Sequence, residues 1–148
     1  MDYINEFRND NYFLSNFYEC PVTYDGLTYR NNESAFQAQK CINPKDREQF
    51  TTLNPSEAKK LGRRVLLRKD WEDIKVQVMK EIVTAKFEQN EDLQQKLLDT
   101  GDAYLEEGNT WGDRVWGSRH PVDVCFEPTE VERRQQLMEQ GQIILARF

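Results

Sequence analysis

Residues 70–87 read DWEDIKVQVMKEIVTAKF, and this stretch decides the predicted fold. Its apolar side chains recur at the spacing of one helix face: Ile74, Val78, Met79, Ile82, Val83 and Phe87. A helix with such a stripe buries it against other elements of the protein. The stretch therefore predicts a long core helix that is capped by Asp70 and ends near Phe87.

Two shorter helices are expected before this core helix. Asn32 is the expected cap of a helix that runs to about Cys41. Asn54-Pro55-Ser56-Glu57 combines a capping Asn, a Pro at the first helical position and a Glu three residues after the cap, which is typical of a helix start. That second helix is expected to end near Gly62.

A small β-hairpin is expected within residues 17–30, where Asp25-Gly26 separates two runs rich in Tyr, Val and Thr. Further helices are expected after Asn90 and within residues 129–138, with a short extended piece around 104–106. The predicted class is thus mainly α (α+β): a compact multihelical domain with a small N-terminal hairpin.

Composition limits the classes of function. The chain has 148 residues, 38% of them hydrophobic and 31% charged, and no linker-like stretch, which favours one globular domain over residues 1–148. The N-terminus has no signal-peptide pattern, and no apolar run could span a membrane. Three well-separated cysteines suggest reduced thiols and a cytoplasmic protein. A net charge of −6 argues against binding through many nucleic-acid phosphates.

Four stretches contain residues suited to chemistry. Glu33, Gln37 and Lys40 fall at i, i+4 and i+7 and can line one helix face, although a Glu near a helix start often only complements the dipole. The stretch 59–69 is basic, with Lys59, Lys60, Arg63, Arg64, Arg68 and Lys69. These cations could bind a phosphate, or merely stabilise a helix end.

The other two stretches are residues 109–117 and 13–18. The first carries Trp111, Asp113 and Trp116 among glycines, which suits either an aromatic pocket with a carboxylate or a turn anchored by core tryptophans. The second includes Asn16 and fits either a polar rim around a sugar or a turn before the hairpin. P-loop, GxGxxG, HExxH and nucleophile-elbow motifs are absent.

Taken together, these pieces resemble the NADAR (NAD- and ADP-ribose-associated, YbiA-like) family over roughly residues 7–117. The matching stretches are FLSNFY at 13–18, ESAFQAQK at 33–40, AKKLGR at 58–63, RKDW at 68–71, LLDTGD at 97–102, LEE at 105–107, and WGD and WG at 111–113 and 116–117. The region from Met79 to Lys86-Phe87 also matches. Ser34 stands where the family usually has His.

The resemblance implies hydrolysis of a ribosyl C–N bond in a phosphoribosylamino-pyrimidine intermediate of riboflavin synthesis. Such a reaction passes through an oxocarbenium-like state that carboxylates stabilise. Glu33 and Asp113 are the expected catalytic pair, without an assignment of which activates water. Trp71 and Trp116 would stack on the base, Lys40, Arg63 or Arg68 would bind the phosphate, and Asn16 would contact the sugar. Neither a metal nor a cofactor is expected.

Three other functions stay open. One is the removal of ADP-ribose from guanine, in which nucleic acid would be bound only as a modified substrate. Another is a non-catalytic module that binds NAD or ADP-ribose. The last is a structural domain with buried tryptophans. For every function except this last one, the expected partner is a small phosphoribosyl or ADP-ribosyl compound, and no membrane is expected to take part.

Overall fold

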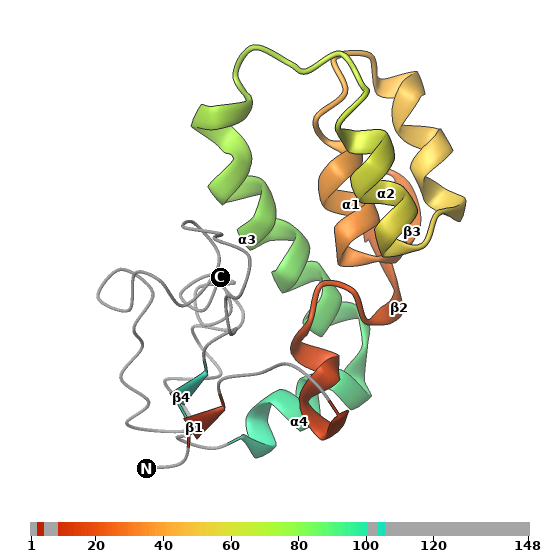
Figure 1. The fold of residues 1–148 in the computed structure, drawn as a ribbon. Helices are drawn as coiled ribbons and strands as arrows, with labels where there is room; N and C mark the ends of the chain where they lie inside the picture. The colour runs from red at the N-terminus through yellow and green to blue at the C-terminus, as the bar shows by residue number, and fades with distance from the viewer. Residues whose placement is uncertain (1–2, 5–8, 101–103, 106–148) are drawn as a thin grey trace. The chain divides into compact units, whose positions relative to one another are not determined.

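The fold is taken from a computed structural model of the whole chain, which describes residues 3–4, 9–100 and 104–105. The chain divides into two compact units. One unit is residues 16–90, and the other combines residues 1–15 with 91–148. Figure 1 shows the elements of both units. The expectation of a single domain stays a prediction.

The unit of residues 16–90 begins with the predicted hairpin. Strands β2 (Glu19–Tyr24) and β3 (Leu27–Asn31) pair antiparallel. Asp25 and Gly26 between them have φ angles of +50° and +86°. Tight hairpin turns of type I′ need a positive φ at both central residues, which Gly adopts freely and Asp tolerates. The Asp25-Gly26 signal in the sequence is therefore confirmed as a turn.

Helix α1 (Asn32–Ala38) follows β3 directly and begins one residue earlier than expected. The cap is Asn31, whose backbone is extended and whose side chain accepts a hydrogen bond from the Ser34 amide at 2.8 Å. The prediction of Asn32 as the cap is wrong, because Asn31 as the last strand residue already has the non-helical conformation of a cap. The helix also ends at Ala38, before Cys41, which forms an isolated bridge to Leu67.

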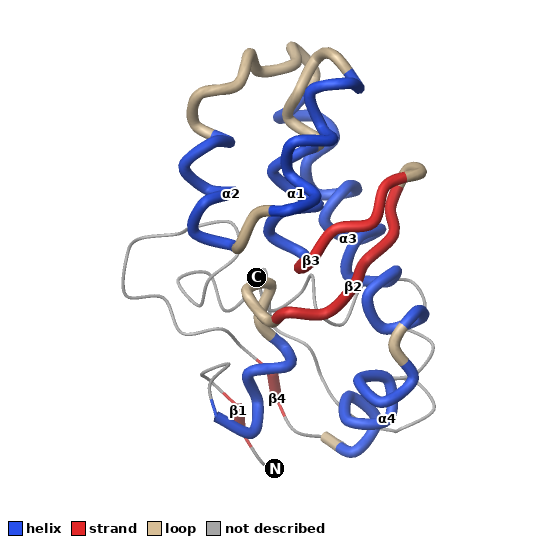
Figure 2. Tube along the Cα trace, turned by 90° about the vertical axis from the view of Figure 1, so that its right-hand side faces the viewer, coloured by secondary structure: helices blue, strands red, loops and turns tan. Residues whose placement is uncertain are grey.

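After the 3₁₀ segment η2 (Pro44–Thr52), helix α2 (Pro55–Gly62) begins where the sequence predicts. Asn54 accepts a hydrogen bond from the Glu57 amide at 2.8 Å, and Glu57 accepts one from the Asn54 amide at 2.9 Å. This reciprocal pair satisfies two backbone donors at the helix start. Helices α1 and α2 lie side by side in Figures 1 and 2.

Helix α3 (Trp71–Gln89) is the predicted core helix and packs against β2 and α1. Five of its six predicted apolar positions are buried, while Ile74 is half-buried. Asp70 stands at the cap position but makes no side-chain capping bond, because its carboxylate pairs with Arg68 at 2.6 Å. Figure 2 shows the hairpin running beside α3, so the core of this unit lies between the hairpin, α1 and α3.

The other unit contains the 3₁₀ segment η1 (Asn9–Leu14) and helix α4 (Glu91–Asp99), with buried Phe13, Leu14, Leu93 and Leu97. Strand β1 (Tyr3–Ile4) pairs in parallel with β4 (Tyr104–Leu105), at the expected extended piece. The helix expected within 129–138 lies outside the described residues. The described elements confirm a mainly helical fold with a small hairpin, and none of these helices is long and apolar enough to cross a membrane.

Candidate active site

The candidate site is built around Glu33 in the first turn of α1. Only 8% of this residue is exposed. Its backbone amide donates to the Asn16 carbonyl oxygen at 3.1 Å, and the Gln37 amide nitrogen donates to Glu33 Oε1 at 3.0 Å. The i, i+4 spacing of Glu33 and Gln37 thus places both on one face, as the sequence predicts. A buried carboxylate with defined partners is a frequent feature of functional sites.

The polar residues next to Glu33 are used to fix α1 in the fold. Asn31 caps the helix, and the Ser34 hydroxyl donates to the Leu53 carbonyl oxygen at 3.0 Å. Asn32 donates from its side chain to Asn16 Oδ1 at 3.0 Å. Buried polar groups need such partners, because water no longer solvates them. Ser34, the departure from the family pattern, therefore contributes to the support of α1.

Asn16, which the sequence suggests as a sugar contact, links three elements. Its Oδ1 accepts from Asn32, its side-chain nitrogen lies 3.6 Å from the sulfur of Met79 on α3, and its carbonyl oxygen accepts from the Glu33 amide. These contacts join the segment before the hairpin to α1 and α3. Asn16 therefore helps to position Glu33, and this role does not depend on a contact between Asn16 and a sugar.

Lys40 interacts electrostatically with Glu33 and with three other cations, and the four positive residues are together called the cation cluster: Lys40, Lys59, Arg63 and Lys75. Lys40 is half-buried, and this burial lowers the pKa of its ammonium group. Glu33 acts in the opposite direction, while the other three cations lower the pKa of Lys40 further. The four positive charges of the cluster outnumber the carboxylates that interact with Lys40 and Lys75, which are Glu33 and Glu72, and this excess favours an anionic ligand.

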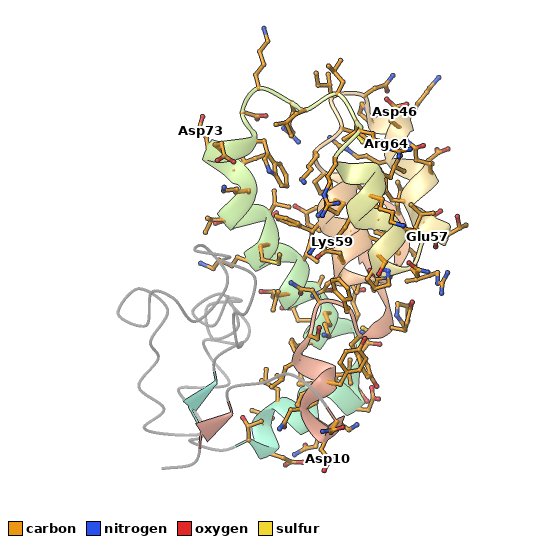
Figure 3. The ribbon with its side chains drawn as sticks, in the orientation of Figure 1. Asp10, Asp46, Glu57, Lys59, Arg64 and Asp73 are labelled. Carbon is orange, nitrogen blue, oxygen red and sulfur yellow. The ribbon has the colours of Figure 1, made fainter. Side chains whose placement is uncertain are left out.

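Three elements supply the cation cluster. Lys59 and Arg63 are four residues apart along α2 and its C-terminal cap, and Lys59 Nζ lies 5.6 Å from the centre of the Phe17 ring. Lys75 on α3 pairs with Glu72 at 2.9 Å. Figure 3 shows Lys59 on α2 and, in contrast, Asp73 on the side of α3 away from α1 and α2. The first turn of α3 therefore directs at least this carboxylate away from the cluster.

Arg68 is the expected phosphate ligand whose guanidinium is already engaged. It makes two hydrogen bonds to Asp70, at 2.6 and 3.1 Å, which raise the pKa of Arg68 and lower that of Asp70. Its backbone amide donates to the Lys40 carbonyl oxygen at 3.0 Å, and Nη1 donates to that of Gln39 at 3.4 Å. The contacts within the described residues tie Arg68 to the chain segment that carries Lys40.

Trp71, the first residue of α3, lies next to Lys40. Its ring is 5.0 Å from that of Phe36 at an interplanar angle of 55°, and Lys40 Nζ is 6.0 Å from the Trp71 ring. Only 5% of Trp71 is exposed. A cation near an aromatic face is attracted to it, so Trp71 helps to place Lys40.

Asp113 and Trp116, the other two residues carried over from the family motif, lie outside the described residues. Among those that are described, the sequence did not single out Lys75 or the contact of Lys59 with Phe17. The i, i+4 spacing of Trp71 with Lys75 is the signal that could have found Lys75, whereas the contact of Lys59 with Phe17 joins distant parts of the chain and has no local signal. Cys20 and Cys41 are buried.

The fold and site define a small, mainly helical protein with a buried glutamate beside a cation cluster. The sequence profile of the NADAR domain matches residues 3–142. The chain belongs to the NADAR domain family.

Named relatives agree with this assignment. The chain is 42% identical over 107 residues to N-glycosidase YbiA of Escherichia coli strain K12, an alignment that covers 70% of this chain and 66% of that protein, just under two thirds. It is 39% identical over 108 residues to a riboflavin biosynthesis protein of Vibrio vulnificus, covering 71% of this chain and 29% of that protein. An N-glycosidase of Nostoc punctiforme is 36% identical over 110 residues, 70% of each chain.

A solved structure is also similar. The NMR structure of the E. coli protein YbiA matches with a TM-score of 0.70 and 34% sequence identity, and the match covers 99% of this chain and 86% of that one. At this identity and coverage, the likeness supports the helical architecture described above.

Proposed function

We propose that the protein is an N-glycosidase that hydrolyses the ribosyl C–N bond of a phosphoribosylamino-pyrimidine. The observation that carries the proposal is Glu33, a buried carboxylate bound by Gln37 and adjacent to the cation cluster. The names of the relatives, N-glycosidase and riboflavin biosynthesis protein, support the same reaction and substrate class.

The proposed reaction breaks the bond between C1′ of the ribose and the exocyclic nitrogen of the pyrimidine. Positive charge develops on the ribosyl ring as that bond lengthens, and a nearby carboxylate stabilises it. Water adds to C1′, one water proton is transferred to a carboxylate, and a proton is delivered to the leaving amine. Glu33 and Asp113 share two tasks, the activation of water and the stabilisation of the ribosyl cation, and the proposal leaves open which of them activates the water.

The binding roles follow from charge and ring chemistry. Lys40 and Arg63, with Lys59 beside them, bind the substrate phosphate. Arg68 supports the Lys40 segment and adds its charge nearby. Trp71 and Trp116 contact the base, and Asn16 lies close enough to Glu33 in the fold to border the sugar. Neither metal nor cofactor takes part in this scheme, and we place the protein in the cytoplasm.

The test measures release of ribose 5-phosphate from a phosphoribosylaminouracil by the wild type and by Glu33→Gln. The substitution keeps the size of the side chain and its hydrogen bonding but removes the charge. Turnover should fall by about two to four orders of magnitude, with substrate binding and the melting temperature near those of the wild type. Wild-type turnover in Glu33→Gln would overturn the catalytic role of Glu33.

A second candidate function is the removal of ADP-ribose from guanine in nucleic acid. It is favoured by the exposed cations Lys60, Arg64 and Lys69, which lie near the cation cluster in the chain and could contact a polynucleotide. Incubation with ADP-ribosylated DNA, run in parallel, distinguishes the two reactions. Release of ADP-ribose from the DNA alone would establish this second function, and binding of ADP-ribose without any product would indicate a non-catalytic module.

A further inference from the structure

The side chain of Gln37 lies between the proposed catalytic glutamate and helix α2. Its Nε2 donates to Glu33 Oε1 at 3.0 Å. Its other end meets Gly62, because a Cβ at position 62 would overlap Gln37 Oε1 and would lie 2.9 Å from Cδ. Gln37 is 6% exposed, so both ends of its amide are enclosed by protein.

The orientation of this amide follows from the chemistry of its neighbour. An ionised carboxylate only accepts hydrogen bonds, so the amide nitrogen faces Glu33 and the oxygen is directed at α2. Among the described residues, Gln37 Oε1 is buried and accepts no hydrogen bond. Leaving a buried acceptor unpaired costs free energy. The amide keeps this orientation despite the unpaired oxygen, because its nitrogen donates to the Glu33 carboxylate.

The last residue of α2 makes room for the arrangement. Gly destabilises a helix relative to Ala, and at Gly62 any larger residue would meet the Gln37 side chain, including its Cβ at 3.3 Å. The φ angle of Gly62 does not lie in the left-handed region, so its backbone conformation does not demand glycine. The close approach of Gln37 therefore accounts for glycine at this position.

We propose that Gln37 is a positioning residue that orients the Glu33 carboxylate, and that Gly62 supplies the space this orientation needs. The inference rests on the proposed function for the role of Glu33 in the reaction. A hydrogen bond donated to the charged form stabilises that form and restricts its rotamer. Glu33 interacts electrostatically with Lys40, which follows α1, and Lys40 also interacts with Lys59 and Arg63 from α2 and with Lys75 on α3.

The first experiment replaces the donor without changing the length of the side chain. Gln37→Met should lower kcat about 10- to 100-fold with little change in KM, because the misplaced group is one that reacts. The acid limb of the pH–rate profile should move to higher pH, since loss of the donor raises the pKa of Glu33.

The matched control is Gln39→Met, in the turn that follows α1. Gln39 is also buried, but its side-chain nitrogen donates to the Ala35 carbonyl oxygen at 3.0 Å and to the Tyr29 hydroxyl at 3.4 Å. This variant should lose stability yet keep the acid limb in place. An unchanged acid limb and kcat in Gln37→Met would overturn the positioning role.

The second experiment tests the contact between Gln37 and Gly62 by a double-mutant cycle. Gly62→Ala should lower kcat in the same direction as Gln37→Met, and it should lower the melting temperature. In a Gln37→Ala background the added methyl has room, so Gly62→Ala should there leave the melting temperature unchanged or raise it. Additive effects of the two substitutions would contradict the contact.

A measurement without substrate separates this inference from the proposed function. NMR titration of the Glu33 carboxyl carbon should show a higher pKa in Gln37→Met than in the wild type and in Gln39→Met. If the wild type releases no ribose 5-phosphate but this shift is present, the proposed function fails and the positioning of Glu33 stands. If turnover is present but the Glu33 titration is the same in all three proteins, the positioning role fails.

Discussion

Helices α1 and α3 contact each other, yet they bury different chemistry. All seven residues of α1 are buried, and four of them are polar: Asn32, Glu33, Ser34 and Gln37. The 19-residue helix α3 buries an apolar stripe, and its one buried charged side chain is Lys86. The short helix thus carries most of the buried polar residues described in this unit, and the long helix carries more of its buried hydrophobic residues than any other element.

This difference indicates that α3 mainly stabilises the fold and that α1 mainly carries the candidate site. Burial of apolar surface stabilises a fold, whereas burial of polar groups is at best weakly favourable even when all are hydrogen-bonded. The buried polar residues of α1 are therefore explained by their hydrogen bonds, which fix the position of Glu33. Substitutions in α3 should mainly change stability, while Glu33→Gln in α1 should mainly change turnover.

The largest effect on stability is expected at Ile82, which is fully buried on α3. Ile82→Ala removes methyl and methylene groups from the core and leaves a cavity. The free energy of unfolding should fall by about 2–5 kcal/mol, as measured by urea denaturation. Turnover per folded molecule should stay within a few-fold of the wild type, because Ile82 makes no contribution to the cation cluster.

The control for Ile82→Ala is Val76→Ala on the same helix, where the side chain is 45% exposed. Its effect should be well below that of Ile82→Ala, since little apolar surface leaves the core. A large loss of turnover in folded Ile82→Ala would contradict the conclusion that α3 mainly stabilises the fold while α1 carries the site.

Lys86 is the exception on α3, and its effect should depend on pH. Complete burial lowers the pKa of its ammonium group to about 8, and its Nζ lies 5.6 Å from the Tyr18 ring. Between about pH 8 and 10.5 the unfolded chain keeps a proton that the folded protein has released. The unfolded state then binds more protons, so this residue makes stability rise with pH across that window.

Lys86→Met tests whether the Lys86 side chain makes stability rise with pH. The variant should be more stable than the wild type below pH 8, and the advantage should shrink by on the order of 3 kcal/mol by pH 10.5. Tyrosine and cysteine titrations occur in both proteins and cancel in the difference. Lys60→Met, at an exposed lysine of α2, is the control and should follow the wild type. A constant difference between Lys86→Met and wild type at all pH values would contradict the lowered pKa.

Much of the fold could be predicted from local sequence signals. The apolar spacing located α3, the Asn54–Glu57 pattern located α2, and Asp25-Gly26 located the hairpin turn. Each signal is contained within a short stretch of chain. The paired short strands β1 and β4 could not be predicted in this way, because their pairing joins residues about 100 positions apart and two residues carry almost no periodicity.

The site was predicted in part. Spacing placed Gln37 and Lys40 with Glu33, but it could not show that Arg68 binds Asp70 or that Asn16 binds Asn32. Those choices depend on which of several polar neighbours comes within hydrogen-bond distance after folding. The same limit explains the error at Asn32, since Asn31 and Asn32 are equally good caps by residue type and only the end of β3 decides between them.

The smallest predicted effects compare the starts of α1 and α3. Asn31→Ala removes an acceptor for the Ser34 amide, at 2.8 Å, and a donor to Leu53, so it should lower the free energy of unfolding by about 1–2 kcal/mol. Asp70→Ala should cost less, because its side chain makes no capping bond. Urea denaturation of both variants measures the comparison. Equal losses of unfolding free energy in the two variants would mean that α1 depends on its polar cap no more than α3 does. The buried polar groups of α1 would then serve only to place Glu33.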